Sequence, residues 1–239
     1  MNHLVLDLGN TRLRAYHFQA GSILNEWELE QLEELPHLVS QLPAAPKILA
    51  SNVGRHSFDA LRKAGLEVQE VGQWLHLPIE LKYQTPETLG QDRIALACGA
   101  QAHYPRRDAL IIDVGTCITY DFKNASGEYL GGAISPGVLM RFEAMHHHTA
   151  RLPLIGKWNE PPKKLIGAST EQSMQIGVWL GVQAEIEGII KRYMQRYPTL
   201  KVLITGGAAS GFAEELNYDI FAAPKLLPEG LNYILEFNA

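Results

Sequence analysis

The chain of 239 residues has only two cysteines, Cys98 and Cys117, and no apolar run that approaches twenty residues. Two cysteines do not make a disulfide framework, so we expect a reduced protein. A helix needs ~20 apolar residues to cross a bilayer, so no membrane span is expected. Asp7 and Gly9 follow the amino terminus too closely for a signal peptide. We therefore expect a cytoplasmic protein.

An excess of positive charge and the common nucleotide-binding motifs are also missing. The formal net charge is −5. Because nucleic-acid binders usually carry a basic patch, we expect neither nucleic acid nor a membrane surface as a partner. The P-loop pattern Gly-x-x-x-x-Gly-Lys-Ser/Thr is absent, and so is Gly-x-Gly-x-x-Gly. These absences exclude the usual P-loop and count against a dinucleotide-binding fold.

One short pattern is present twice. An apolar run leads into Asp7-Leu8-Gly9-Asn10-Thr11, and another leads into Asp113-Val114-Gly115-Thr116, with the aspartates 113 − 7 = 106 positions apart. Glycine lets the backbone approach a ligand closely, and the N–H groups of such a turn form a concavity that binds anions. The repeat predicts two similar halves, 1–108 and 109–239, that each present a turn to a common polyphosphate.

Hydrophobic patterning and turn residues predict an α/β protein, because helices and strands alternate after an initial meander of strands. The expected strands are 4–8, 12–18, 22–29, 47–53, 66–71, 110–114, 118–122, 128–134, 201–205 and 218–222. The expected helices are 30–42, 57–64, 90–103, 138–147, 170–197, 208–216 and 228–237. The 170–197 helix contains Gly177, Gly181 and Gly188, each of which costs ~1 kcal/mol relative to alanine. We expect another backbone or a partner chain to approach these glycines.

The residues of the two turns suit the transfer of a phosphoryl group. That reaction needs fixed hydrogen-bond donors, a metal ion and a positioned acceptor more than it needs covalent chemistry. The first turn offers donors at 9–11 and positive charge at Arg12 or Arg14, and the second offers Gly115 and Thr116. The aspartate at the end of each strand can hold hydrated Mg²⁺ or another cation.

This arrangement resembles the actin, hexokinase and Hsp70 superfamily of ATP-binding proteins. The resemblance implies two similar ribonuclease-H-like domains, with ATP in the cleft between them and its phosphates gripped by the two turns. Gly206-Gly207 follows a predicted strand and looks like the glycine pair that faces the adenosine in that superfamily. A plain strand-to-helix turn explains this pair equally well on local grounds.

Further motifs resemble one family within this group, the type III pantothenate kinases, and the resemblance runs from residue 4 to about residue 207. The motifs are Asp7-Leu8-Gly9-Asn10-Thr11, Gly90-Gln91-Asp92-Arg93, Asp113-Val114-Gly115-Thr116, Gly131-Gly132-Ala133-Ile134-Ser135-Pro136-Gly137 and Thr170…Met174-Gln175…Gly177. The resemblance implies the ATP-dependent phosphorylation of pantothenate to 4′-phosphopantothenate, which opens coenzyme A synthesis. It also implies Mg²⁺ with ATP, K⁺ or NH₄⁺ as a second cation, and a homodimer.

The same resemblance implies a role for each candidate residue. Asp92 is the general base, and Asp113 holds the monovalent cation. The residues that contact pantothenate are Tyr83, Gly90, Gln91, Asp92, Arg93 and Thr170. The residues that contact ATP are Asp7, Leu8, Gly9, Asn10, Thr11, Arg12, Leu13, Arg14, Thr116, Gly206 and Gly207. The chain departs from the family at Arg14, where many members carry lysine, and at Ile176, where a small serine is common.

Elementary chemistry agrees with the role of Asp92. A primary alcohol is a poor nucleophile until its proton has an acceptor, and a carboxylate within hydrogen-bond reach provides one. Arg93 would keep that carboxylate ionised, and it can bind the carboxylate of pantothenate through two hydrogen bonds. From the residues alone, the alternative is that Asp92 caps the 90–103 helix. Two other functions stay open: a kinase for a sugar or a short acid, and a non-catalytic ATP-binding regulator.

Overall fold

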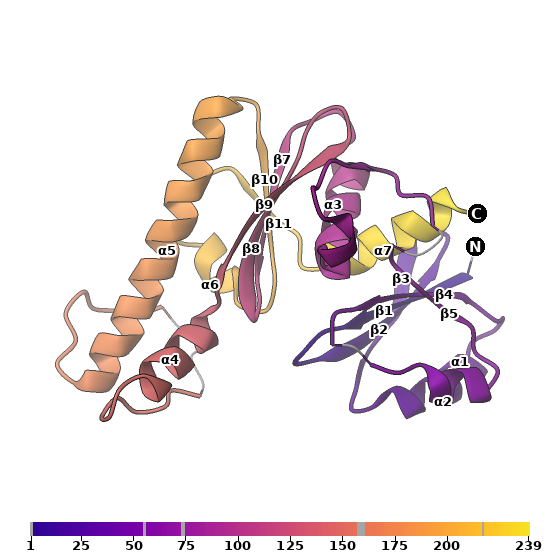
Figure 1. Cartoon of the computed structure of the whole chain (residues 1–239), viewed down its shortest axis with the longest axis horizontal. Coiled ribbons are helices and arrows are strands. Elements are labelled where there is room, and N and C mark those ends of the chain that lie inside the picture. The colour runs from indigo at the N-terminus through magenta and orange to yellow at the C-terminus, as the bar shows by residue number, and fades with distance from the viewer. Residues whose placement is uncertain (1, 55, 73–74, 157–160, 217) are drawn as a thin grey trace. The chain divides into compact units, whose positions relative to one another are not determined.

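The computed structural model describes residues 2–54, 56–72, 75–156, 161–216 and 218–239 (Figure 1). Contacts divide the chain into two compact units, each assembled from separate segments. The first unit comprises Met1–Arg106, Lys123–Leu130 and Lys225–Ala239, and the second comprises Arg107–Phe122 and Gly131–Pro224. The division of the sequence into the halves 1–108 and 109–239 is predicted from the repeated turn, and it stays a prediction. The compact units follow a different division, because the carboxyl-terminal segment belongs to the first unit.

The first unit is built on a sheet with the strand order β3-β2-β1-β4-β5. Its strands are β1 (Asn2–Leu8), β2 (Leu13–Gln19), β3 (Ser22–Leu29), β4 (Lys47–Asn52) and β5 (Val68–Glu70). The first three strands pair antiparallel, whereas β4 runs parallel to both β1 and β5. The carboxyl ends of β1 and β4 therefore lie at the same edge of the sheet, where the first turn begins.

Helices cover both faces of this sheet. Leu4 and Leu6 pack on the side of η1 (Leu32–Glu34), α1 (Leu35–Ser40) and α2 (Asp59–Lys63). Val5 and Leu49 pack on the side of α3 (Gln91–His103) and α7 (Leu226–Phe237). The opposite placement of Leu4 and Val5 follows from the alternation of side chains along a strand. The predicted 30–42 helix is divided in two, and Pro36, which lacks an N–H group, lies at the start of α1.

Two glycines let α3 and α7 cross in backbone contact. A Cβ atom on Gly230 would lie 1.9 Å from the carbonyl oxygen of Ala95, and one on Gly99 would lie 2.5 Å from that of Leu226. Both separations are far below van der Waals contact, so no other residue fits at this crossing. The crossing fixes the axis of α3, the helix whose first turn carries Asp92.

The second unit repeats the order of strands. Its strands are β7 (Ala109–Val114), β8 (Cys117–Lys123), β9 (Glu128–Pro136), β10 (Lys201–Thr205) and β11 (Ile220–Ala222). The order β9-β8-β7-β10-β11 matches β3-β2-β1-β4-β5 element for element. The α/β fold class, predicted from the alternation of helices and strands, and its duplication, predicted from the repeated turn, are therefore confirmed.

A long helix covers one face of the second sheet. The helices of this unit are α4 (Val138–His147), α5 (Thr170–Arg196) and α6 (Ala209–Ala213). Ile112 of β7 packs in one cluster with Val182 and Ile186 of α5 and with Phe212 of α6. The segment α6 is shorter than the predicted 208–216 helix. Within the described ranges, no helix is long and apolar enough to span a bilayer.

Two short elements escaped prediction. Strand β6 (Glu80–Leu81) pairs with Glu128 and Tyr129 of β9, in the part of β9 that belongs to the first unit. The 3₁₀ turn η2 (Pro86–Thr88) follows it and leads toward α3. A two-residue strand is too short to show alternation, so the sequence carries no signal for it.

Candidate active site

The first turn is closed by its own backbone. The N–H group of Gly9 donates to the carbonyl oxygen of Arg12 at 3.0 Å, and this bond folds β1 back into β2. The expected role of this amide as a phosphate donor is therefore limited, because the amide already has a partner. Asn10, Thr11 and Arg12 are exposed at the tip of the turn. Arg12 also lies 3.9 Å from the Glu28 carboxylate across the hairpin.

Asp7 lies at the end of β1 between two neighbouring strands. It pairs with Arg14 of β2 on one side and with Ser51 of β4 on the other. Burial raises the pKa of the Asp7 carboxyl to about 6, while the charge of Arg14 lowers it and that of Asp92 raises it. The start of α3, which carries Asp92, also contacts this region directly, because Gln91 Oε1 accepts from the Asn52 N–H group at 2.7 Å and Asn52 pairs with Leu8. The structure thus brings the candidate base and the first turn together.

We expect Asp7→Asn to stabilise the protein at neutral pH more than at pH ~4, because the pKa of Asp7 is higher in the folded state than its ordinary value of 3.8. The folded state therefore binds the proton more tightly, and the wild-type free energy of unfolding falls as pH rises from about 4 to about 6. Asparagine does not ionise, so the variant does not lose this free energy of unfolding as pH rises. Urea unfolding at several pH values measures the difference, which should widen across that window. A constant difference would contradict the expectation.

Asp92 is the second residue of α3, after the N-cap Gly90 and Gln91. Its Oδ1 atom accepts a hydrogen bond from the Arg93 N–H group at 2.8 Å. A Cβ atom on Gly90 would lie 2.4 Å from that same oxygen, so the carboxylate folds back over the helix start where only glycine leaves room. Asp92 is therefore not the N-cap residue of α3. It supports the first turn of the helix and stays half-buried at its amino-terminal end.

Arg93 and Tyr83 form a stacked pair beside Asp92. The Arg93 side chain is buried, and its guanidinium carbon lies 5.9 Å from the centre of the Tyr83 ring. The Tyr129 ring lies 6.1 Å from the Tyr83 ring. Cation–π and aromatic contacts of this kind hold the Tyr83 ring in place. The expected contact of Arg93 with the carboxylate of pantothenate stays a prediction.

Four candidate residues lie at or beside the second turn, within the second unit: Asp113, Thr116, Gly206 and Gly207. The Gly115 N–H group donates to the Cys117 carbonyl oxygen at 3.0 Å, and the Gly137 N–H group donates to the Thr116 carbonyl oxygen at 3.1 Å. Gly206 has φ of +100°, and a Cβ atom there would lie 2.3 Å from Oδ1 of Asp113. Gly206 is therefore glycine for a local reason, since it packs directly on the carboxylate. Gly207 is exposed beside it.

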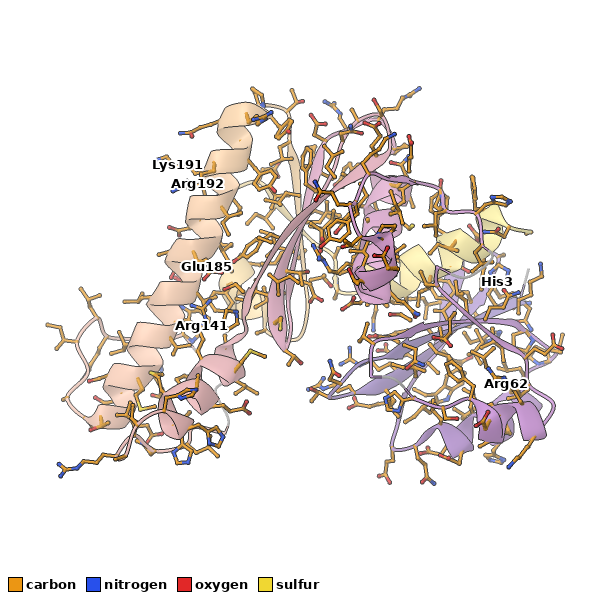
Figure 2. All side chains as sticks on the ribbon, viewed as in Figure 1. His3, Arg62, Arg141, Glu185, Lys191 and Arg192 are labelled. Carbon is orange, nitrogen blue, oxygen red and sulfur yellow. The ribbon has the colours of Figure 1, made fainter. Side chains whose placement is uncertain are left out.

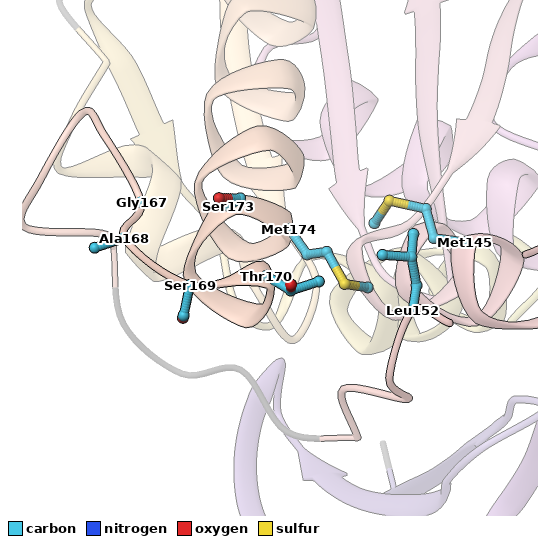
Figure 3. Close-up of a pocket in the computed structure, with 8 residues that line it drawn as sticks. All are labelled: Met145, Leu152, Gly167, Ala168, Ser169, Thr170, Ser173 and Met174. Carbon is cyan, nitrogen blue, oxygen red and sulfur yellow. The ribbon is translucent and has the colours of Figure 1, made fainter. Parts of the chain in front are cut away.

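Thr170 lies in a different part of the second unit. It lines an open pocket of about 690 Å³ with Ser169, Met174, Met145 and other residues (Figure 3). Met145 lies near the end of α4, whereas Gly137, which contacts Thr116, precedes the start of that helix. A helix of ten residues is ~15 Å long, so the Met145 side of the Thr170 pocket and the second turn lie toward opposite ends of α4.

A polar cluster that the sequence did not reveal holds the end of β9. Arg141 donates from Nη2 to Glu185 Oε2 at 2.6 Å and from Nε to the Pro136 carbonyl oxygen at 2.9 Å (Figure 2). The Tyr120 hydroxyl donates to Glu185 Oε1 at 2.8 Å. Burial raises the pKa of Glu185, but the bonds from Arg141 and Tyr120 outweigh it and hold that pKa below its ordinary value. The cluster fixes the segment that leads to Gly137.

The candidate cation ligands are single carboxylates. In the part of the chain that is described, no group of three or more His, Cys, Asp or Glu side chains is arranged to hold a metal ion. Mg²⁺ is commonly bound through one or two carboxylates together with the phosphates of its substrate and water. Asp7 and Asp113, each at the end of a strand, fit a cation that arrives with a polyphosphate.

The solved structures that resemble this chain share its fold. A Baf family protein from Campylobacter jejuni matches with a TM-score of 0.62 and 22% sequence identity, covering 98% of each chain. The inorganic polyphosphate/ATP-glucomannokinase from an Arthrobacter species matches with a TM-score of 0.51 and 13% identity, covering 99% of this chain and 98% of that one. At these identities the likeness supports the fold alone.

Sequence comparisons go further. The family model described as type III pantothenate kinase matches residues 3–192. The type III pantothenate kinase of Christiangramia forsetii is 41% identical over 242 residues, covering 99% of this chain and 98% of the relative. That of Cytophaga hutchinsonii is 39% identical over 236 residues, covering 99% of each. The chain therefore belongs to the type III pantothenate kinase family.

Proposed function

We propose that the protein transfers the γ-phosphoryl group of ATP to the primary hydroxyl of pantothenate, giving 4′-phosphopantothenate and ADP. The observation that carries the proposal is the neighbourhood of Asp92 and the first turn: Gln91, next to Asp92, accepts a hydrogen bond from the Asn52 N–H group at 2.7 Å, and Asn52 pairs with Leu8 at that turn. A general base beside a phosphate-binding turn is the arrangement that phosphoryl transfer to an alcohol needs. Membership in the family supplies the identity of the alcohol.

The transfer is a single displacement at the γ-phosphorus. The pantothenate hydroxyl oxygen forms a bond to the γ-phosphorus while the bond from that phosphorus to the bridging oxygen of ADP breaks. The hydroxyl proton passes to the Asp92 carboxylate, which is half-buried at the start of α3. Arg12 and Arg14 place positive charge beside the first turn. This charge would stabilise the negative charge on the oxygens of the phosphoryl group during its transfer.

The reaction would also need two cations. Mg²⁺ with ATP would be held at Asp7, and K⁺ or NH₄⁺ would be held at Asp113, whose carboxylate lies under Gly206 and next to the second turn. The ions would supply positive charge that stabilises the phosphates. Thr116 would contact the ATP phosphates, and Thr170 and Tyr83 would contact pantothenate.

A coupled assay of ADP release tests the function. Turnover should require pantothenate, ATP and Mg²⁺ together, and it should rise when K⁺ or NH₄⁺ replaces Na⁺. No turnover of pantothenate under any cation condition would overturn the assignment. Turnover of a sugar or a short acid in its place would support the related-kinase alternative, and ATP binding without acceptor-dependent ADP release would support the regulator.

We also propose that the protein is a homodimer in which α5 contacts the partner. A Cβ atom added at Gly177 would meet nothing within 4 Å, and one at Gly181 would meet only Nη1 of Arg141 at 4.0 Å. The described residues of the same chain therefore leave these glycines open. Leu180 lies between them and is 37% exposed, and Ile134 of β9 is 62% exposed. Open glycines beside exposed apolar side chains suit close approach by a second chain.

Leu180→Glu is expected to weaken the dimer by at least ~10-fold in Kd, since a buried carboxylate without a partner costs several kcal/mol. Sedimentation velocity over a range of protein concentrations measures the effect. Leu24→Glu is the matched control, because Leu24 is 52% exposed on β3 and belongs to the first unit, whereas α5 belongs to the second. If both variants associate as the wild type does, this face of α5 is not the interface.

A further inference from the structure

Gln91 precedes the candidate base Asp92, and its side chain contacts the ends of two strands of the first unit. Its Oε1 atom accepts a hydrogen bond from the Asn52 N–H group at 2.7 Å, and its Nε2 group donates to Glu70 Oε2 at 3.3 Å. Asn52 ends β4 and Glu70 ends β5. The carboxamide therefore ties the first residue of α3 to the carboxyl ends of two parallel strands.

The strand end that Gln91 contacts is itself fixed to the first turn. Asn52 pairs in parallel register with Leu8, the residue between Asp7 and Gly9. The loop that follows Asn52 returns to the same place, since the Gly54 N–H group donates to the Leu8 carbonyl oxygen at 3.1 Å. A Cβ atom on Gly54 would lie 2.8 Å from the Gly9 carbonyl oxygen, so this loop lies directly against the turn.

The loop also has an internal restraint. The Asn52 side chain accepts from the His56 N–H group and donates to the His56 carbonyl oxygen, both at 2.9 Å. Asparagine often closes a local turn with its side chain in this way. The backbone atom that Gln91 contacts is thus held from two sides, by the sheet and by its own loop. A bond to it places α3 relative to the first turn.

Another hydrogen bond at the start of α3 is local, from the Arg93 N–H group to Oδ1 of Asp92. The N-cap residue is Gly90, and no side chain caps the helix. The crossing with α7 at Gly99 and Gly230 fixes the middle and later part of α3. The first turn of a helix lacks four of its internal hydrogen-bond acceptors and frays most easily. The two hydrogen bonds of Gln91 restrain the amino-terminal end of α3, which contains Asp92.

We propose that Gln91 is a positioning residue for phosphoryl transfer, whose carboxamide sets the place of the Asp92 carboxylate relative to the first phosphate turn. This inference rests on the proposed function, and it gives Gln91 a task other than the pantothenate contact that the family resemblance implies. A base must lie within hydrogen-bond reach of the attacking hydroxyl while the turn holds the phosphate. A misplacement of ~1 Å can cost ~10²-fold in rate, so one tie at this point affects kcat.

An exchange of the two bonded side chains tests the proposal. Gln91→Glu keeps an oxygen that can accept from Asn52, but it sets a carboxylate against Glu70, and the repulsion drives the side chain away from both strand ends. We expect kcat to fall by at least ~10-fold, with the KM for pantothenate changed by less than ~3-fold. Glu70→Gln alone should stay close to wild type, because the amide oxygen still accepts from Gln91. The double variant Gln91→Glu/Glu70→Gln restores the pair with donor and acceptor exchanged, and kcat should recover to within ~3-fold of wild type.

Hydrogen exchange gives a readout that does not depend on activity. The amides of Arg93 and Ile94, which donate to Asp92 Oδ1 and to the Gly90 carbonyl oxygen, should exchange faster in Gln91→Glu and regain protection in the double variant. Unchanged protection in Gln91→Glu, or a double variant no better than that single one in kcat, would overturn the positioning role. A raised KM for pantothenate with normal kcat would assign Gln91 to substrate contact instead. Absence of wild-type turnover would sink the proposed function, and the exchange data would still decide whether the tie exists.

Discussion

Asp92→Asn is expected to lower kcat for pantothenate phosphorylation by at least ~10²-fold, the usual scale for the loss of a general base, while ATP binding is retained. Asparagine has nearly the same shape, and its amide oxygen can still accept the Arg93 N–H bond that Asp92 makes at 2.8 Å. The helix start is therefore preserved, and only the proton acceptor is lost. Steady-state ADP release measures kcat, and calorimetric titration of ATP measures binding.

Asp59→Asn is the matched control for this change. Asp59 is also an acidic residue in the first turn of a helix, α2, and its side chain is 73% exposed in an ion pair with Arg62. The same chemical substitution there should leave kcat within ~2-fold of wild type, since exposed ion pairs contribute little. Near-normal turnover of Asp92→Asn would show that Asp92 is not the base. Parallel loss of turnover and ATP binding would assign it to the binding of the nucleotide.

The regular elements around the site could be predicted because their burial is periodic. Leu4, Leu6 and Leu8 face one side of the first sheet and Val5 faces the other, so the alternation that the sequence shows is the alternation that the structure buries. The repeated Asp-x-Gly pattern then located the turn at the end of β1 and at the end of β7. Both turns are local in sequence, which is why their residues were identified correctly as turns.

The rest of the site depends on contacts between residues far apart in the chain. Gln91 lies 39 positions from Asn52, and Arg141 lies 44 positions from Glu185. A polar residue has the same local pattern whether its side chain faces water, a substrate or another strand. The direction of Gln91 therefore could not be predicted from its neighbours. The functional roles of Asp92, Asp113 and Thr170 came from the family resemblance, and they stay predictions.

The loop after β4 has only a weak signal in the sequence. Asn52 and Val53 close the predicted 47–53 strand, and Gly54 follows it, so Asn52-Val53-Gly54 has the composition of a strand end that leads into a turn. Because β4 runs parallel to β1, its carboxyl end had to reach the same edge as Gly9 if the two strands were neighbours. The strand order was not available from the sequence, so the Asn-x-Gly pattern could not be placed beside the first turn. Topology, and not composition, makes this loop part of the site.

Gly230→Ala is expected to lower the free energy of unfolding by about 2–3 kcal/mol, the upper part of the range for an overpacked core. Two effects oppose each other at this position in α7. Alanine favours the helix by ~1 kcal/mol over glycine. Its methyl group, however, would lie 1.9 Å from the Ala95 carbonyl oxygen, and a backbone atom of a buried helix cannot move aside by changing a rotamer. The steric effect therefore wins, and urea unfolding followed by circular dichroism measures the loss.

Gly188→Ala, made in the Leu180→Glu background to remove the proposed dimer contact, separates the two effects, because Gly188 lies inside α5 and a Cβ atom there would meet nothing within 4 Å in the same chain. Only the helix preference remains, so this variant should gain up to ~1 kcal/mol. A loss of stability at Gly230 with a gain at Gly188 would locate the cost in the crossing of α3 and α7. That crossing carries the helix of Asp92, so kcat should fall in Gly230→Ala under conditions where the protein is still folded. Equal responses at the two glycines would mean that α7 shifts to admit a methyl group, and that the placement of α3 does not depend on the close contact.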